Sequence, residues 1–480
     1  MKSQILAGVI AAAMLPAIIV PSSQTSADSS GMRDITTMEL VRDMGIGINL
    51  GNTMEAAGDW IAQWGDGTVR SYETAWGSPE ITQDMINGYA SEGFGVLRIP
   101  VAWSNLMGEN YKISSDYMAR VQQLVTWTID ADMYAIINIH WDNGWVNKFP
   151  ENKDESMKRY TSMWEQICEG FKDYDDHLMF ESQNEELGWE SMWNRWGGPS
   201  DKEGSYALVN EINQKFVDTV RSSGGNNPKR HLLISGYNTG IDTTCDPLFK
   251  MPSDPAGRCA VSVHYYTPAS FAILEEDADW AKMRPSWGTS DDFRELNKQM
   301  DMMKTSFIDK GIPVIIGEYG CPIKNKDLES VQLYLSSVCK AAYERHLCPV
   351  MWDTPGGHYD REAGKMTDQT LMAQLRSYLD PKPEPVTDPT ASTEPPEEIK
   401  WGDADCDGQV KMNDAVLIMQ SLSNPDRYGI DGSDDGHITE KGKRNANVYE
   451  NVTSSITPQD ALAVQQYLLK IIASLEPAKA

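Results

Sequence analysis

Two short runs of the chain decide its fold class: LMFESQN at residues 178–184, which is followed by Glu185, and PVIIGE at residues 313–318. Each run passes directly from residues typical of a buried strand to a glutamate. Six further runs of similar length and β-branched content are GIGINL (45–50), GVLRIP (95–100), YAIINIH (134–140), HLLISG (231–236), AVSVHY (260–265) and PVMWD (349–353). Such runs are typical of buried parallel strands.

The segments between these runs are long enough for crossover helices. Residues 117–130 and 206–222 have helical periodicity. Eight strand–helix units of this kind predict an α/β fold, a (β/α)8 TIM barrel over residues 33–379.

Reactive side chains stand at the carboxyl ends of six of the eight runs. In a (β/α)8 barrel these strand ends converge on one active-site face. A single such residue could be a structural polar group, but the repetition predicts one shared site. Its candidate members are Arg98, His140, Asn184, Glu185, His264, Tyr266, Glu318 and Trp352.

The two glutamates Glu185 and Glu318 end the fourth and seventh runs, which lie on roughly opposite sides of a barrel mouth. Hydrolysis of a glycosidic bond needs a proton donor and a second carboxylate, about 5–5.5 Å apart in retaining enzymes. We expect the charge of Glu318 to raise the pKa of Glu185, which would keep Glu185 protonated. An acid at a strand end is common, so neither glutamate alone would indicate this chemistry.

The runs LRIP, NIHWD, ESQNE, VHYYTP, IIGEYG and MWD resemble those of glycoside hydrolase family 5, over about residues 35–378. GINLGNTMEA and HYYTPASFA are similar to its subfamily 4. The resemblance implies an endo-β-1,4-glucanase (a cellulase) that retains anomeric configuration, acts on cellulose or related β-glucans and needs no cofactor for catalysis. Xyloglucanase, xylanase and mannanase activities are alternatives, because the same barrel and acids serve them all.

The resemblance also implies a role for each candidate residue. Glu318 would be the nucleophile and Glu185 the acid/base. Arg98 would keep Glu318 ionised, Tyr266 would donate a hydrogen bond to Glu318, Asn184 would hold the sugar 2-hydroxyl, His140 and His264 would orient substrate and carboxylates, and Trp352 would stack beneath a sugar. A non-catalytic glycan-binding protein is a further alternative, but it would be expected to lack one of the carboxylates.

Two positions depart from the family pattern. Glu186 replaces the proline that usually follows the acid/base, and Trp141 stands where a second histidine is common. Six other tryptophans lie in or near loops after strands, where they would either extend a sugar-binding cleft or pack in the core. They are Trp60, Trp64, Trp145, Trp189, Trp193 and Trp287.

A proline- and threonine-rich linker at residues 380–400 separates the barrel from a C-terminal segment. This segment contains DADCDGQVKMND (403–414), in which Asp403, Asp405, Asp407 and Asp414 occupy positions 1, 3, 5 and 12 of a calcium loop, with Gly408 at the turn. A helix is expected over residues 415–421. Residues 456–469 repeat the pattern of residues 410–422 after a degenerate loop, which predicts one strong calcium site and one divergent site.

A calcium loop with one following helix, present twice, resembles a dockerin, here residues 401–475, of the kind found in rumen-type cellulolytic bacteria. The resemblance implies structural Ca²⁺, a cohesin domain of a scaffoldin as partner, and a cellulosome as location. A calcium-stabilised module without a partner is the alternative.

Residues 1–27 have the charged start, apolar stretch and small residues of an export signal, so we expect a secreted, extracellular protein. The net charge of −28 argues against nucleic acid and anionic membranes as partners. Seven cysteines show no metal-site spacing. Cys245 and Cys259 could close a short loop; otherwise we expect free, buried thiols.

Overall fold

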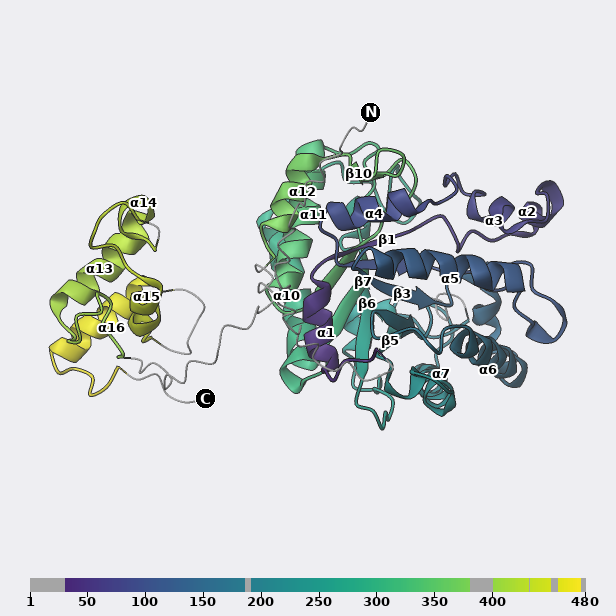
Figure 1. Ribbon diagram of the computed structural model, residues 1–480, viewed down its shortest axis with the longest axis horizontal. Coiled ribbons are helices and arrows are strands. Elements are labelled where there is room, and N and C mark those ends of the chain that lie inside the picture. The colour runs from purple at the N-terminus through teal and green to yellow at the C-terminus, as the bar shows by residue number, and fades with distance from the viewer. Residues whose placement is uncertain (1–30, 186–190, 380–399, 431, 450–455, 476–480) are drawn as a thin grey trace, which may run out of the picture. The chain divides into compact units, whose positions relative to one another are not determined.

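The structure, a computed structural model, describes residues 31–185, 191–379, 400–430, 432–449 and 456–475 (Figure 1). The chain divides into one unit that ends at Pro381 and a second that begins at Lys382. The expected export signal and all of the expected linker except Lys400 lie outside the described residues.

The first unit is a closed barrel of eight parallel strands in chain order, which confirms the predicted (β/α)8 fold. Each strand overlaps one of the eight runs found in the sequence. The strands are β1 (Gly47–Asn49), β2 (Val96–Ile99), β3 (Tyr134–Asn138), β4 (Leu178–Glu181), β5 (Leu232–Gly240), β6 (Cys259–Tyr265), β7 (Val314–Tyr319) and β8 (Cys348–Met351). Their side chains are buried almost throughout, as expected where helices cover a parallel sheet.

The helices surround this barrel in Figure 1. The expected helices at 117–130 and 206–222 correspond to α5 and α7. The longer helices are α4 (Gln83–Ser91), α5 (Ser115–Asp130), α6 (Lys153–Gly170), α7 (Lys202–Ser222), α10 (Ser290–Ser306), α11 (Leu328–Tyr343) and α12 (Gln369–Arg376). The connections contain α2 (Asp59–Trp64), α3 (Val69–Glu73), η1 (Glu109–Tyr111), η2 (Asp142–Lys148), η3 (Asn227–Lys229), α8 (Ile241–Thr244), α9 (Ala269–Ala272), η4 (Ile308–Lys310), β9 (Tyr359–Asp360) and β10 (Lys365–Met366).

The amino end of the barrel is closed by α1 (Thr37–Met44). Thr36 and Glu39 form a capping box that fixes the start of this helix. Leu40, Val41 and Met44 share one buried cluster with side chains from strands β2 to β8. This end of the barrel is therefore packed with apolar groups, and polar chemistry is left to the carboxyl ends of the strands.

Strand register brings the candidate residues to one level at the carboxyl end. Asn49 pairs with Arg98, Asn138 with Glu181, and His264 with Glu318. Because neighbouring strands lie about 4.8 Å apart, side chains at paired positions are within reach of each other.

The second unit is a small helical domain built on α13 (Met412–Ser423) and α16 (Pro458–Leu468), with α14 (Pro425–Tyr428) and α15 (Glu440–Ala446) beside them. Its core contains Leu417 and Ile418 of α13 and Val464 of α16. The helices expected at residues 415–421 and within 456–469 thus form and pack together. Among the described helices of the whole chain, none combines the length and apolar character needed to cross a bilayer.

All seven cysteines are free, so the disulfide considered between Cys245 and Cys259 does not form. The Cys245 thiol lies 3.6 Å from the sulfur of Met303, and the Cys259 thiol donates to Asp254. Four of the other cysteines, Cys168, Cys321, Cys339 and Cys348, are buried.

We expect Arg230→Met to destabilise the barrel by at least about 3 kcal/mol, because buried carbonyls would lose charged donors. The fully buried guanidinium donates to four carbonyls, those of Phe171, Tyr174, Asp175 and Leu178, which form the turn before β4. Chemical denaturation would measure the change. Arg70→Met is the control, because the Arg70–Glu80 pair is exposed and should contribute less than about 1 kcal/mol. An equal loss of unfolding free energy in Arg230→Met and Arg70→Met would contradict the prediction.

Candidate active site

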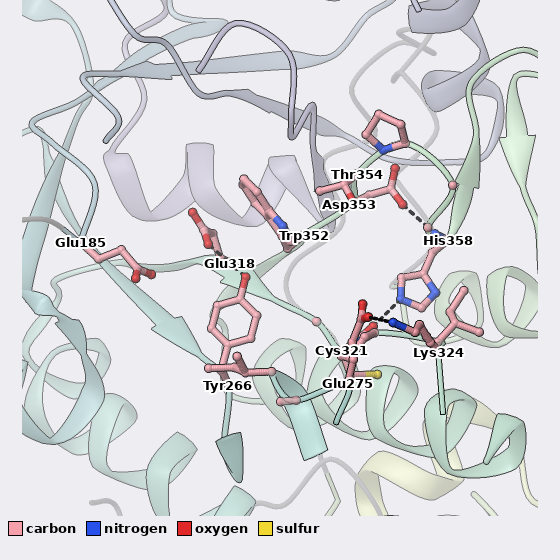
Figure 2. Close-up of a pocket in the computed structure, with 18 of the residues that line it drawn as sticks. Glu185, Tyr266, Glu275, Glu318, Cys321, Lys324, Trp352, Asp353, Thr354 and His358 are labelled. Atoms are coloured by element: carbon pink, nitrogen blue, oxygen red, sulfur yellow. Dashed lines mark hydrogen bonds and ion pairs between the residues drawn. The ribbon is translucent and has the colours of Figure 1, made fainter. Parts of the chain in front are cut away.

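A cavity of about 610 Å³ opens at the carboxyl ends of the strands. Of the eight residues predicted from the sequence, six line it: His140, Asn184, Glu185, Tyr266, Glu318 and Trp352. Figure 2 shows Glu185 and Glu318 facing into this space, with the Tyr266 hydroxyl beside Glu318. The remaining two, Arg98 and His264, contact the carboxylates from behind the cavity wall.

Arg98, on β2, is fully buried and joins four strand ends through one guanidinium. It donates from Nη1 to Glu318 Oε1 at 2.8 Å and to Asn49 Oδ1 at 2.9 Å. It also donates from Nε to Glu181 at 2.7 Å and from Nη2 to Asn184 Oδ1 at 2.8 Å. These planar, charge-assisted bonds fix the side chains of both Glu318 and Asn184.

Glu318 has three polar neighbours. Besides Arg98, the Tyr266 hydroxyl donates to Oε2 at 3.0 Å, and His264 Nδ1 lies 3.6 Å from the same oxygen. Burial raises the pKa of Glu318, while the charges of His264 and Arg98 act in the opposite direction.

Glu185 is bound to His264, whose Nδ1 lies 2.7 Å from Oε1. Burial acts to raise the pKa of Glu185, but the hydrogen bond with His264 and the charges of His264 and Arg98 outweigh it and lower this pKa. The directions for the two glutamates are therefore the reverse of those expected from the sequence.

Trp352 lies parallel to His140, with ring centroids 6.0 Å apart and planes 7° apart. Burial lowers the pKa of His140 well below its ordinary value, so this ring is neutral. Gly51 makes room for the tryptophan, since a Cβ there would stand 3.0 Å from Trp352 Cζ2. Gly51 is held in turn by Arg361, which donates to its carbonyl at 2.6 Å.

Sequence reasoning missed part of the layer beneath the cavity. Asn49, on β1, is buried and donates to the carbonyls of Gly317 and Met351. Glu181, on β4, accepts from Asn138 at 3.0 Å and Ser262 at 2.7 Å in addition to Arg98. A sequence signal existed for part of this layer: Asn138 and Ser262 stand two residues before His140 and His264, the spacing at which strand side chains point to one side.

The sequence of the barrel unit matches a known family. Residues 54–356 match the family model described as cellulase (glycosyl hydrolase family 5). The chain belongs to glycosyl hydrolase family 5.

Individual relatives agree with the family match. The xyloglucan-specific endo-beta-1,4-glucanase BoGH5A of Bacteroides ovatus is 34% identical, over 73% of this chain and 72% of the relative. Endoglucanase A of Ruminococcus albus is 37% identical, over 68% of this chain and 85% of the relative. A solved GH5-4 broad specificity endoglucanase from an uncultured bovine rumen ciliate has a TM-score of 0.65 and 33% identity, covering 72% of this chain and 98% of that one. These family 5 matches support glycoside hydrolase activity on β-glucans.

Most of the other tryptophans considered as cleft residues do not serve that purpose in this family 5 barrel. Trp145 and Trp287 are buried in the core, and Trp193 is half-buried against it. Trp60 and Trp64 are exposed but do not line the catalytic cavity. Trp189, like the unusual Glu186, lies outside the described residues.

The candidate calcium loop brings three of its four predicted aspartates together. Carboxylate oxygens of Asp403, Asp405 and Asp414 lie within 4.8 Å of one another. Asp403 and Asp414 are buried, and Oδ1 of Asp403 has no hydrogen-bond partner among the described residues. Asp407 instead binds Lys411 at 2.5 Å. A buried, unpaired carboxylate oxygen within an oxygen cluster fits a hard cation.

The second copy of the pattern holds its aspartate in the same way as the first. Asp460 accepts backbone hydrogen bonds from Val448, Tyr449 and Thr457 and a further one from the Thr457 hydroxyl. Asp414 of the first copy likewise accepts from the backbone of Asp405 and Lys411, so this aspartate does not distinguish the two copies. Residues 450–455 of the second loop lie outside the described residues, and its divergence stays a prediction.

We expect Arg98→Gln to lower kcat/KM about 100-fold or more, because a preorganised charge beside Glu318 is lost. The charge of Arg98 lowers the pKa of Glu318, so its removal raises that pKa. Because Glu318 must be ionised to act, the variant loses activity at a higher pH than the unsubstituted enzyme when the pH is lowered. The acid limb of the pH profile of kcat/KM therefore moves to higher pH. Arg98→Lys keeps the charge and should move this limb less. An acid limb that stays in place in Arg98→Gln would contradict the prediction.

Proposed function

We propose that the chain is a retaining endo-β-1,4-glucanase with Glu318 as nucleophile and Glu185 as acid/base. The observation that carries this proposal is that carboxylate oxygens of the two glutamates lie within 4.8 Å of each other. Retaining glycosidases have carboxyl groups about 5–5.5 Å apart, whereas inverting enzymes need about 6.5–9.5 Å to accommodate a water.

In this mechanism Glu318 attacks the anomeric carbon while Glu185 donates its proton to the leaving glycosidic oxygen. The products are a free sugar end and a glycosyl ester on Glu318. Glu185 then removes a proton from water, which attacks the same carbon and releases Glu318 as a carboxylate. Arg98 and Tyr266 hold Glu318 in place and stabilise its negative charge before attack and after release.

The contact between Glu185 and His264 explains how the acid acquires its proton. In the free protein the hydrogen bond with His264 helps lower the pKa of Glu185. A glycosidic oxygen that takes the place of His264 beside Glu185 removes this effect, and burial by the substrate then raises the pKa. When the charge of Glu318 is lost in the glycosyl ester, the pKa of Glu185 falls again, which suits its second role as a base.

The walls of the cavity support a β-glucan substrate. Trp352, half-buried in the cavity wall and parallel to His140, offers an indole face on which the apolar face of a sugar can stack. Arg98 fixes the amide of Asn184 with its oxygen inward, which suits that residue to hold a sugar 2-hydroxyl. Xyloglucan is the second candidate substrate, because the Bacteroides ovatus relative is xyloglucan-specific.

The C-terminal unit supports attachment to a scaffold. We infer that it is a dockerin whose Asp403, Asp405, Asp407 and Asp414 hold Ca²⁺, with Asp407 turning away from Lys411 to do so. The bound ion would supply positive charge that fixes the loop against α13. On the outside of α13, Met412, Val416 and Met419 are exposed at helical spacing and suit an apolar contact with a cohesin domain. Export directed by residues 1–27 would bring the enzyme to an extracellular scaffold.

We expect the full chain to release reducing sugar from soluble β-glucan and xyloglucan, with little release from xylan or glucomannan. The first products observed by proton NMR should keep the β-configuration. Glu318→Gln should abolish turnover and retain binding of the polymer, since the change removes the nucleophile but little volume. Absence of release from all four polymers would favour the glycan-binding alternative, and α-configured first products would exclude the retaining mechanism.

Removal of calcium with a chelator should abolish binding to a cohesin-bearing scaffold protein and leave hydrolysis unchanged, because the barrel uses no metal in the proposed mechanism. Asp403→Asn should weaken calcium binding about tenfold or more, as measured by calorimetry on the full chain. Asp434→Asn is the matched control, since that exposed-loop carboxylate binds Arg427 instead. Equal loss of hydrolysis and docking on chelation would contradict the division of roles.

A further inference from the structure

The exposed tryptophans of the barrel unit lie on one type of connection. Among its described residues, the exposed ones follow β1, β3, β4 and β6, on segments that leave the carboxyl ends of strands. They are Trp60, Trp64, Trp141, Trp196 and Trp280. This is the end at which the catalytic cavity opens, yet none of the five lines that cavity. A single exposed aromatic residue needs no explanation, but five on the connections at one end of a barrel point to an interaction at that end.

Trp60 and Trp64 form the closest such pair in the sequence. They stand four residues apart on α2, so their side chains share one face of the helix. Trp64 is 84% exposed and Trp60 47% exposed, values that leave the indole faces open to a ligand.

The face of α2 that carries Trp60 and Trp64 is fixed by contacts with the rest of the barrel unit. Ile61, between the two tryptophans, is buried in the core of the barrel unit. The Trp60 ring lies against Gly58, where a Cβ would stand 2.8 Å from Nε1. The following helix α3 packs on α5, and Glu73 pairs with Arg120. Figure 1 shows α2 and α3 as an arm that extends beyond α4 and runs along α5.

The same connection borders the path to the catalytic cavity. Gly77 and Pro79, just after α3, line a second hollow of about 360 Å³. This hollow and the catalytic cavity share Pro355, Gly356 and Gly357 as a common wall. The segment that carries the tryptophans is thus continuous with the substrate-binding end of the barrel.

The chemistry of the face fits a sugar polymer. Indole faces stack on the apolar C–H faces of pyranose rings. Asp59, Gln63 and Asp66 are exposed around the pair and supply acceptors and donors for hydroxyl groups. The two carboxylates, within a chain of net charge −28, disfavour nucleic acid and anionic lipid.

We propose that Trp60 and Trp64 form a second binding site for long β-glucan chains, outside the catalytic cavity. The site would hold the polymer near the enzyme while a different stretch of it occupies the cavity. The proposal rests on the proposed function for the identity of the polymer, but the site takes no part in the chemistry.

The test compares a long polymer with a short one. In the full chain carrying Glu318→Gln, which prevents turnover, Trp60→Ala/Trp64→Ala should weaken binding of a long soluble β-glucan about tenfold in affinity electrophoresis. Binding of cellotetraose, measured by calorimetry, should be unchanged. In the active enzyme the same double variant should keep its kcat/KM on cellotetraose. Unchanged affinity for the long polymer would overturn the proposal.

Three control variants test whether sugar stacking on α2 causes the loss of affinity. Trp60→Phe/Trp64→Phe should retain most of the affinity for the long β-glucan, whereas Trp60→Leu/Trp64→Leu should lose it. If the leucine variant retained this affinity, sugar stacking would be overturned and an apolar protein contact favoured. Trp280→Ala removes an exposed tryptophan from the connection after β6, and an equal loss there would overturn the assignment to α2. If the unsubstituted chain did not hydrolyse cellotetraose at all, that result would instead count against the proposed function.

Discussion

The guanidinium of Arg98 imposes the constraint on which the active-site end of the barrel depends. It is fully buried between the carboxylates of Glu181 and Glu318. A buried cation without partners would cost several kcal/mol, so the strands that carry those carboxylates must keep their register. Barrel closure and the position of the nucleophile are therefore aspects of one electrostatic arrangement.

The two ends of the barrel are stabilised mainly by different kinds of interaction. At the amino end, α1 buries apolar side chains against the strands. At the carboxyl end, the catalytic carboxylates have charged or hydrogen-bonding partners. The Glu318 carboxylate gains Arg98 and Tyr266, and the Glu185 carboxylate gains His264.

Much of this architecture could be predicted from the sequence, because strand burial and strand-end residues are local patterns. The eight strands and the gathering of Arg98, Glu185 and Glu318 at one end follow from them. The reversed pKa directions could not be predicted, since they depend on the 2.7 Å contact between His264 and Glu185. Burial of aromatic residues was equally unpredictable, because whether a loop tryptophan packs inward depends on distant segments.

The state of the cysteines has a practical consequence for handling the protein. All seven thiols are free, and burial raises the pKa of Cys168, Cys321, Cys339 and Cys348. A thiol in that condition is a poor nucleophile and resists alkylation and air oxidation. Folding therefore needs no oxidising compartment, and the chain is suited to recombinant production in a reducing bacterial cytosol without a disulfide isomerase.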